Sequence, residues 1–278
     1  MAKIFVFPGQ GSQIVGMGKE LFDKFGVIVK QADQVLGYSI KTLCLEDPDK
    51  KLNSTDYTQP AMYVINALTY LKSVQETGKP DFVAGHSLGE YNALFAAEVF
   101  TFATGLKLVQ KRGEIMAKAK GGGMAAVIGM EADKIRRVLE ESGFNTIDVA
   151  NFNSPAQTVI SGLKEDIVKA QAAFQNAGAK LYVPLTVSGA FHSRYMKPAQ
   201  QEFEKFLDQF TFNQPKIPVI ANYTAKTYEP DKIKETLANQ ISNPVRWVET
   251  IQYLKQQPNP EFAEIGPGKV LTKLVTQI

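Results

Sequence analysis

Apolar and polar residues follow one another along the chain in a pattern that predicts strands alternating with helices. Apolar runs at residues 3–7 and 82–84 predict two buried strands, and helical spacing of apolar residues at 59–75 predicts a long helix between them. Further helices are expected at 17–25, 90–99 and 101–119. Strands that alternate with helices are typical of a parallel sheet, so we expect an α/β fold.

The pattern changes in the middle of the chain. Six elements are expected there in the order strand 124–129, helix 132–142, strands 146–151 and 158–162, helix 164–177 and strand 180–187. This β-α-β-β-α-β order is that of a ferredoxin-like unit. We therefore expect residues 124–189 to form a small subdomain inserted into a large subdomain of residues 1–123 and 190–278. Gly121, Gly122 and Gly123 would be its hinge, and the cleft between the subdomains is a natural place for a small ligand.

The pentapeptide Gly85-His86-Ser87-Leu88-Gly89 lies between the second predicted strand and the helix predicted at 90–99. Glycines two positions before and after a serine permit the sharp strand-to-helix turn of a nucleophile elbow, because a Cβ there would collide with neighbouring backbone. The turn exposes the serine hydroxyl and leaves the N–H of Leu88 free to stabilise an oxyanion. Ser87 is therefore the candidate nucleophile.

A serine nucleophile needs a base, and the chain has only two histidines, His86 and His192. His86 precedes the serine in the same turn and is expected to project to its other side. His192 lies in the segment 188–193, whose small residues suit a loop that passes close to another backbone. His192 is therefore the candidate base, with a purely structural histidine as the alternative.

A glycine-containing loop at 8–13 follows the first predicted strand. It does not match a phosphate-binding fingerprint, because the dinucleotide motif requires glycine at the position of Ile14 and no Gly-Lys-Ser/Thr follows. Gly9 and Gly11 can instead let the loop approach a neighbouring site and bring the side chain of Gln10 over it.

One arginine of the helix predicted at 101–119 lies at an unusual position for a charged residue. Arg112 falls close to the buried side of this helix, which Val109 and Met116 mark. An unpaired buried guanidinium is unfavourable, so Arg112 needs a partner. An ion pair with an internal Asp or Glu is one explanation. The other is a bidentate clamp for a substrate carboxylate, which suits the planar fork of arginine.

Composition excludes several classes of protein. The 278 residues are 44% apolar and 21% charged, which is ordinary for a globular protein of one or two domains. One cysteine and two histidines leave no disulfide framework and no usual zinc site. A net charge of +3 is too small to indicate nucleic acid. With no signal peptide or membrane span and a single cysteine, Cys44, a cytoplasmic location is expected.

These features together resemble the malonyl-CoA:acyl carrier protein transacylase family, including the discrete, trans-acting acyltransferases of polyketide assembly lines. The resemblance covers essentially the whole chain. Its motifs are FPGQGSQ at 7–13, TQPA at 58–61, GHSLGE at 85–90, QKRGEIM at 110–116, GGGMAAV at 121–127, NFNSP at 151–155, GAFHS at 189–193, NPVRW at 243–247 and EIGPGKVLTKL at 264–274. Nine motifs in register are far more specific than any one of them.

The resemblance implies an α/β-hydrolase-like core with a ferredoxin-like insertion, and a catalytic role for several residues. Ser87 would take the acyl group as an ester, with His192 as general base and then general acid. The backbone N–H groups of Gln10 and Leu88 would form the oxyanion hole, so the side-chain role considered for Gln10 gives way. The backbone carbonyl of Gln240 would orient the imidazole where a triad would use Asp.

The resemblance also implies the substrate. Arg112 matches the arginine that binds the malonyl carboxylate, which favours the clamp over the ion pair. Phe191 matches a bulky position associated with malonyl rather than branched acyl units. Met116 and Asn153, in two of the matching motifs, are further candidate substrate-binding residues. The implied activity is transfer of malonyl from malonyl-CoA to the phosphopantetheine thiol of acyl carrier protein, for polyketide or fatty acid synthesis, without metal or bound cofactor.

Two other functions are alternatives to acyl transfer. An acyl hydrolase related to the family would use Ser87 and His192 but release the acid. It would have no reason to bury Arg112 if its acyl chains carry no carboxylate. A non-catalytic module that docks acyl carrier protein would need neither Ser87 nor His192. Lys180, Arg194 and Lys197 are candidate basic residues for binding an acidic carrier.

Overall fold

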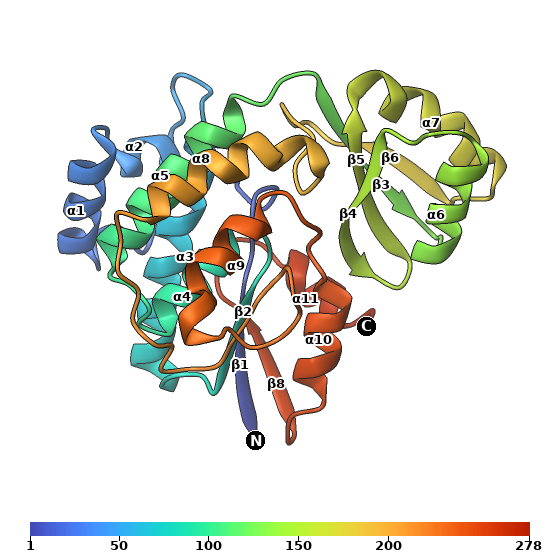
Figure 1. Ribbon diagram of the computed structural model, residues 1–278. Helices are drawn as coiled ribbons and strands as arrows, with labels where there is room; N and C mark the ends of the chain where they lie inside the picture. Colours follow the sequence, from blue (N-terminus) through green and yellow to red (C-terminus); the bar gives the residue numbers. More distant parts are fainter.

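The computed structural model describes residues 1–278 and contains two separate sheets (Figure 1). The first sheet has four parallel strands in the order β7-β2-β1-β8. Its strands are β1 (Ala2–Phe7), β2 (Phe82–Gly85), β7 (Val219–Ile220) and β8 (Pro260–Glu264). Parallel strands need crossover connections, and helices supply them here. The predicted α/β fold with a parallel sheet is confirmed.

Alternate residues of β1 face opposite layers of helices, because successive side chains of a strand point to opposite faces. Phe5 and Phe7 belong to the largest apolar cluster, which includes residues of α3 (Thr55–Thr77), α4 (Gly89–Ala96) and α5 (Phe102–Ala117). Ile4 and Val6 belong to a second cluster, with residues of α10 (Trp247–Lys255) and α11 (Val270–Val275). The sheet is therefore covered on both faces.

The second sheet is antiparallel and lies to one side of the first in Figure 1. Its order is β4-β5-β3-β6, and its six elements follow the predicted β-α-β-β-α-β order. They are β3 (Gly122–Ile128), α6 (Ala132–Glu141), β4 (Ile147–Ser154), β5 (Gln157–Leu163), α7 (Lys164–Asn176) and β6 (Leu181–Pro184). The ferredoxin-like unit is confirmed, whereas the exact division of the chain into subdomains at 124 and 189 stays a prediction.

Two local predictions are wrong. The helix expected at 17–25 is a series of turns, and the first helix, α1 (Gly26–Leu36), begins only after this segment. Gly16 and Gly18 have positive φ, and a Cβ on Gly18 would lie 2.4 Å from Ile65 Cδ1, so the backbone passes too close to α3 for a helix. Of the glycines expected as a hinge, Gly122 and Gly123 pair with β5 instead.

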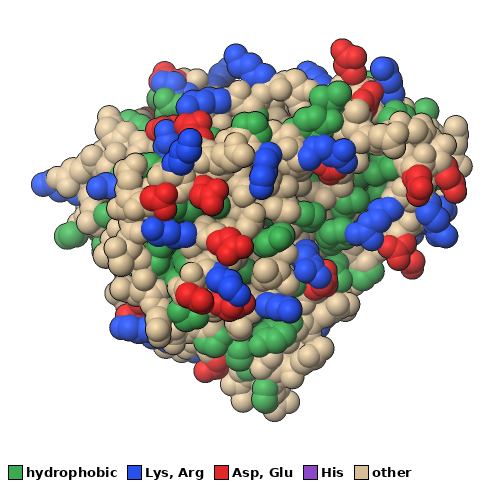
Figure 2. All heavy atoms as spheres, viewed as in Figure 1, with side chains coloured by type: hydrophobic (Ala, Val, Ile, Leu, Met, Phe, Trp, Pro, Cys, Tyr) green, Lys and Arg blue, Asp and Glu red, His purple; other side chains and the backbone are tan.

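The remaining helices complete the fold around the parallel sheet. They are α2 (Ile40–Leu45), α8 (Lys197–Leu207) and α9 (Ile233–Gln240), and two short 3₁₀ helices lie at Arg194–Met196 and Pro230–Lys232. None of the helices is both long and apolar enough to cross a membrane. On the face seen in Figure 2, basic and acidic side chains are interspersed, and neither sign dominates a broad area.

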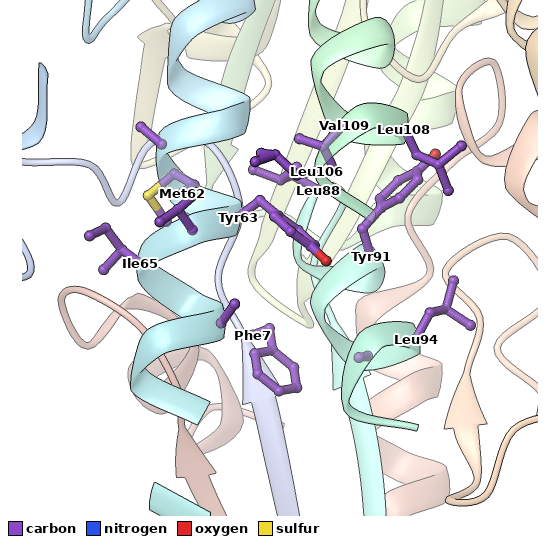
Figure 3. Packing of buried hydrophobic residues seen from close by; sticks show 14 of the residues in the cluster. Phe7, Met62, Tyr63, Ile65, Leu88, Tyr91, Leu94, Leu106, Leu108 and Val109 are labelled. Atoms are coloured by element: carbon purple, nitrogen blue, oxygen red, sulfur yellow. The ribbon is translucent and has the colours of Figure 1, made fainter. Parts of the chain in front are cut away.

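The buried core holds the elbow in place. Figure 3 shows Leu88 and Tyr91 of the elbow region among Tyr63 of α3 and Leu106 of α5, and Phe7 lies at the end of β1. All five side chains are buried. Burying a large apolar side chain contributes roughly 1.5–3 kcal/mol, so this packing fixes α4 firmly against its neighbours.

A short stretch of backbone next to the site pairs with the edge of the antiparallel sheet. Val245 donates its N–H to Ala150 O at 2.8 Å, and Phe152 donates its N–H to Val245 O at 2.9 Å. The segment before α10 therefore continues the edge of the antiparallel sheet beyond β4. This pairing places β4 beside the loop that carries residues 240–246.

Candidate active site

The elbow is built as its glycines predict. Ser87 has φ +51, in the left-handed region, and it follows the last residue of β2 by two positions. A Cβ on Gly85 would lie 2.0 Å from Gly89 C, and one on Gly89 would lie 2.0 Å from Phe7 O. No side chain fits at either position, so the turn can pack tightly against β1 only with glycine there.

Ser87 and His192 lie within hydrogen-bond distance although 105 positions separate them. Ser87 Oγ and His192 Nε2 are 2.8 Å apart. His192 Nδ1 lies 2.9 Å from Gln240 O and 3.2 Å from Asn243 O. Because carbonyl oxygens only accept, Nδ1 carries the proton, and Nε2 is left to accept the Ser87 hydroxyl proton.

The carbonyl of Gln240 takes the position that an Asp has in other triads. Gln240 is the last residue of α9, and the last carbonyls of a helix have no partner within the helix. The C-terminal end of a helix also carries partial negative charge, which stabilises an imidazolium. The end of α9 thus accepts the Nδ1 proton of His192, with Asn243 as a second acceptor, and the role of Gln240 in orienting a catalytic imidazole stays a prediction.

His192 is nevertheless neutral in the resting site. It is 4% exposed, and burial together with the nearby Arg112 lowers its pKa to about 3, against the bonds to Gln240 and Asn243 that raise it. Like Ser87, His192 has a left-handed backbone, with φ +57. The side chain is therefore ready to act as a base throughout the neutral range.

Two backbone N–H groups lie beside the nucleophile without a protein acceptor. Neither Gln10 nor Leu88 donates its N–H to any group of the protein. A Cβ on Gly9 would lie 2.5 Å from His86 O and 3.6 Å from Leu88 N, so the loop after β1 passes directly over the elbow. This arrangement suits an oxyanion hole, and the oxyanion role of both groups stays a prediction.

Arg112 is buried against the nucleophile, and it makes no ion pair. It is 1% exposed, and its Nη1 donates to Gln59 Oε1 at 2.8 Å. Its Nη2 donates to Gln240 Oε1 at 2.9 Å and to Ser87 Oγ at 3.2 Å. The Tyr91 ring lies 5.6 Å from its Cζ. The direct ion pair considered from the sequence is wrong, because every hydrogen-bond partner is neutral.

The Nε of Arg112 has no acceptor in the protein. Leaving a buried charged donor unpaired is costly, so such a donor next to a reactive serine is a strong indication of a ligand. Arg112 Nε is therefore free to donate to a further acceptor, while Nη2 already reaches Ser87 Oγ. Carboxylates suit a guanidinium because both are planar.

The other predicted residues lie near this centre in different surroundings. Met116, one turn after Arg112, is buried with its Sδ 3.4 Å from Gln59 Nε2. Phe191 is buried next to His192. Asn153 Oδ1 lies 2.8 Å from His86 Nε2. His86 thus points away from the serine hydroxyl, as expected, and the substrate contacts of Met116, Phe191 and Asn153 stay predictions.

Several polar contacts of the site were not predicted from the sequence. Asn222 Oδ1 accepts from Ser87 N–H at 2.7 Å, and Gln240 Nε2 donates to Ser87 O at 2.8 Å and to Glu90 Oε2 at 2.8 Å. Glu90 is completely buried. Gln59 and Glu90 lie within motifs quoted above, which was the only available signal. Nothing in the sequence around Asn222 indicates its role.

A groove of about 1260 Å³ lies between the antiparallel unit and residues 242–252, and His192 is among the residues that line it. Its lining includes His192 and Asn243 on one side and Phe152 of β4 on the other. Arg194 and Lys197 also line it, whereas Lys180 does not. A groove lined by the imidazole can admit a chain whose terminal group reaches His192, and Ser87 Oγ lies 2.8 Å from His192 Nε2.

Known proteins are similar to this chain in sequence and in fold. Residues 4–277 match the family described as acyl transferase domain. PksC of Bacillus subtilis, a polyketide biosynthesis malonyl CoA-acyl carrier protein transacylase, is 55% identical over 276 residues, which is 99% of this chain and 96% of PksC.

Two solved structures are similar over nearly their whole length. The crystal structure of malonyl CoA-acyl carrier protein transacylase from Burkholderia pseudomallei has a TM-score of 0.97 and 50% identity, covering 100% of this chain and 97% of that one. The malonyl-transacylase PlMCAT, solved with the type II polyketide synthase acyl carrier protein AntF, has a TM-score of 0.95 and 38% identity, covering 100% and 93%.

Proposed function

Because the chain belongs to the acyl transferase domain family, we propose that it transfers malonyl from malonyl-CoA to the phosphopantetheine thiol of an acyl carrier protein. The observation that carries this proposal is the buried Arg112, whose Nε lacks an acceptor while its Nη2 contacts Ser87 Oγ. A cation in this position pairs with an acyl group that itself carries a carboxylate. Malonyl is such a group, and acetyl is not.

In the first half-reaction, His192 Nε2 takes the proton of Ser87 as Oγ attacks the thioester carbonyl of malonyl-CoA. The negative charge of the tetrahedral intermediate falls beside the N–H groups of Gln10 and Leu88. One oxyanion donor of this kind is typically worth about 3–4 kcal/mol. The C–S bond then breaks, and His192 returns its proton to the leaving CoA sulfur. The product is malonyl-Ser87 and free CoA.

In the second half-reaction, the thiol of the phosphopantetheine arm takes the place of CoA. His192 accepts the thiol proton, and the sulfur attacks the ester carbonyl of malonyl-Ser87. When the intermediate collapses, the C–O bond to Ser87 breaks and His192 returns the proton to Oγ. Both half-reactions use one serine and one imidazole, so the kinetics are of the ping-pong type.

The acyl pocket and the groove suit the two ends of the substrate. The phenyl ring of Phe191 beside the base fills space that a branched acyl unit would need. The groove gives a path for the pantetheine chain, and Arg194 and Lys197 at its side carry charge that an acidic carrier or the phosphates of CoA would meet. We place the activity in polyketide synthesis because of the identity to PksC, with fatty acid synthesis as the alternative. A cytoplasmic location stays a prediction.

The rival functions fit less well. A hydrolase of uncharged acyl chains has no use for Arg112, and the relatives are named as transacylases. A docking module has no use for a 2.8 Å contact between a serine hydroxyl and a neutral imidazole.

The mass of the intact protein after brief incubation with malonyl-CoA, followed by phosphopantetheinylated acyl carrier protein, tests the proposal. We expect a malonyl adduct that moves to the carrier and that is absent in Ser87→Ala. An adduct that decays to free malonate without loading the carrier would indicate a hydrolase. No adduct at all would contradict the assignment of Ser87 as nucleophile for this substrate.

A further inference from the structure

Two opposite charges are buried in the site without touching each other. Arg112 is 1% exposed, and Glu90, at the start of α4, is 0% exposed. Gln240 lies between them: its Oε1 accepts from Arg112 Nη2 at 2.9 Å, and its Nε2 donates to Glu90 Oε2 at 2.8 Å. The amide dipole is aligned between cation and anion. Glu90 is therefore the internal counter-charge of Arg112, although the side chain of Gln240 separates the two groups.

The surroundings of Glu90 hold a carboxylate in place. Its Oε2 also accepts from the N–H of Asn222 at 3.1 Å, and its Oε1 is bonded to the hydroxyl of Tyr228. Both groups on Oε2 are donors, and the hydroxyl can donate to Oε1. The geometry provides for a charged Glu90 and leaves no water in contact with it.

We propose that Glu90 limits the preference for carboxylated acyl groups, because its charge competes with the substrate carboxylate for Arg112. This inference rests on the proposed function, since it requires a malonyl carboxylate at Arg112. Glu90 touches neither the substrate nor Ser87 in this scheme. It acts through Gln240 on the clamp.

The physical reason is the balance of charge in a buried space. With Glu90 ionised, Arg112 and Glu90 together are neutral. A malonyl carboxylate would add a second anion to a region with a single cation, and two like charges in one site disfavour each other. Protonation of Glu90 removes the excess charge. Malonyl binding and protonation of Glu90 therefore favour one another, and this coupling is reciprocal.

Glu90 is the group at this place that titrates near neutral pH. Burial raises its pKa to about 7, although its bonds to Tyr228, Gln240 and Asn222 and the charge of Arg112 act to lower it. The other ionisable groups facing it are Tyr91 of α4, Tyr228 after β7 and Arg112 of α5. Burial raises the pKa of both tyrosines, so only Arg112 among them is charged.

Glu90→Gln removes the charge of the side chain but can keep its hydrogen bonds. The two donors from the protein meet the same oxygen, Oε2, which an amide oxygen can replace. The amide NH₂ in the place of Oε1 can donate to the hydroxyl of Tyr228, which also accepts. Glu98→Gln, just after α4 and paired with Lys79 and Lys216 on the surface, is the matched control.

The measurement is the second-order rate constant for loading Ser87 from malonyl-CoA and from acetyl-CoA, by mass of the intact protein between pH 6 and pH 8. The ratio of the malonyl rate constant to the acetyl rate constant cancels effects on the serine and the imidazole, because both substrates share them. We expect Glu90→Gln to raise the malonyl-to-acetyl ratio about tenfold at pH 8, the scale of one screened charge. In the wild type and in Glu98→Gln the ratio should fall as pH rises through about 7, and in Glu90→Gln it should stay flat.

Tyr228→Phe gives an independent test, because it removes one donor from the carboxylate and so favours the protonated form. It should raise the ratio in the same direction. An unchanged ratio in both variants, or equal changes for both acyl groups, would overturn the inference and leave Glu90 a structural brace. Failure of the wild type to load malonyl while it loads acetyl would instead overturn the proposed function.

Discussion

Ser87 and His192 both adopt left-handed backbone conformations that side chains rarely take. Such conformations persist only where the surroundings over-determine them. For Ser87 these are the bonds of its N–H to Asn222 Oδ1 and of its carbonyl to Gln240 Nε2. The side chain of Gln240 therefore holds the backbone of Ser87, while its backbone carbonyl accepts from His192 Nδ1.

Replacing Arg112 tests the clamp at the scale of one side chain. Arg112→Ala removes the only cation at the acyl pocket, so we expect malonyl loading to fall by roughly a hundredfold more than acetyl loading. Arg112→Lys keeps the charge but loses the fork, and should restore only part of the malonyl rate. Loading rate constants from both thioesters provide the measurement. An equal loss for both would contradict the carboxylate clamp.

Asn153 has a structural contact that can be tested separately from its predicted role. Asn153→Ala leaves the buried Nε2 of His86 without its partner, so we expect the free energy of unfolding to fall by about 1–3 kcal/mol. Urea unfolding gives this value. The predicted substrate contact of Asn153 requires, in addition, slower loading at a temperature where the variant is fully folded. An unchanged unfolding free energy would show that His86 finds another partner.

At the scale of elements, the elbow depends on how closely α4 approaches β1. Gly89→Ala would place a Cβ 2.0 Å from the carbonyl oxygen of Phe7, which belongs to the backbone and cannot turn aside. We expect a loss of about 3 kcal/mol or more in the free energy of unfolding, with loss of acyl loading.

The matched control for Gly89→Ala is Gly26→Ala. Gly26 is the first residue of α1, and a Cβ there would meet nothing within 4 Å. The unfolding free energy should change by less than about 1 kcal/mol, since alanine is the better helix former. Thermal or urea unfolding of both variants measures the contrast. Equal stability of the two would mean that β1 and α4 can separate without cost.

The sequence predicted those parts of the site that depend on local chemistry. Ser87 followed from two glycines, and His192 from the shortage of imidazoles. Gln240 came only from the resemblance, because a helix-terminal carbonyl leaves no mark on the choice of side chain. Asn222 meets Ser87 across 135 positions, and only the packing of β7 against β2 brings them together. The prediction of a helix at 17–25 was wrong because the spacing of apolar residues does not indicate how closely α3 passes.

At the scale of the whole molecule, buried titratable groups make stability depend on pH. Burial lowers the pKa of His192 to about 3, so between pH 6.5 and about 4.5 the unfolded chain binds a proton that the folded chain does not bind. This proton costs about 1.4 kcal/mol of stability per unit of falling pH, and burial also lowers the pKa of His86, which acts in the same direction. Burial raises the pKa of Glu90 to about 7, so in the same window the folded chain binds one proton more, which acts in the opposite direction.

In this window the contributions of His192 and Glu90 offset each other, and His86 adds a loss of stability on acidification. We expect the free energy of unfolding to fall by at most about 1.4 kcal/mol per unit as the pH is lowered from 6 to 5. In Glu90→Gln the opposing contribution is gone, so the slope should be steeper by about 1.4 kcal/mol per unit. Urea midpoints at several pH values measure both slopes. A stability that rises on acidification would contradict the burial of the two imidazoles.

The order of strands in the parallel sheet has a consequence for the newly made chain. β1 pairs with β2, only about eighty residues later, but also with β8, whose residues 260–264 are made about 250 residues after β1. The antiparallel sheet, whose strands all lie within residues 122–184, has its full set of partners long before. One edge of β1 therefore lacks its partner strand while the residues between β1 and β8 are made, and at this edge the nascent chain can bind chaperones, proteases or other copies of itself.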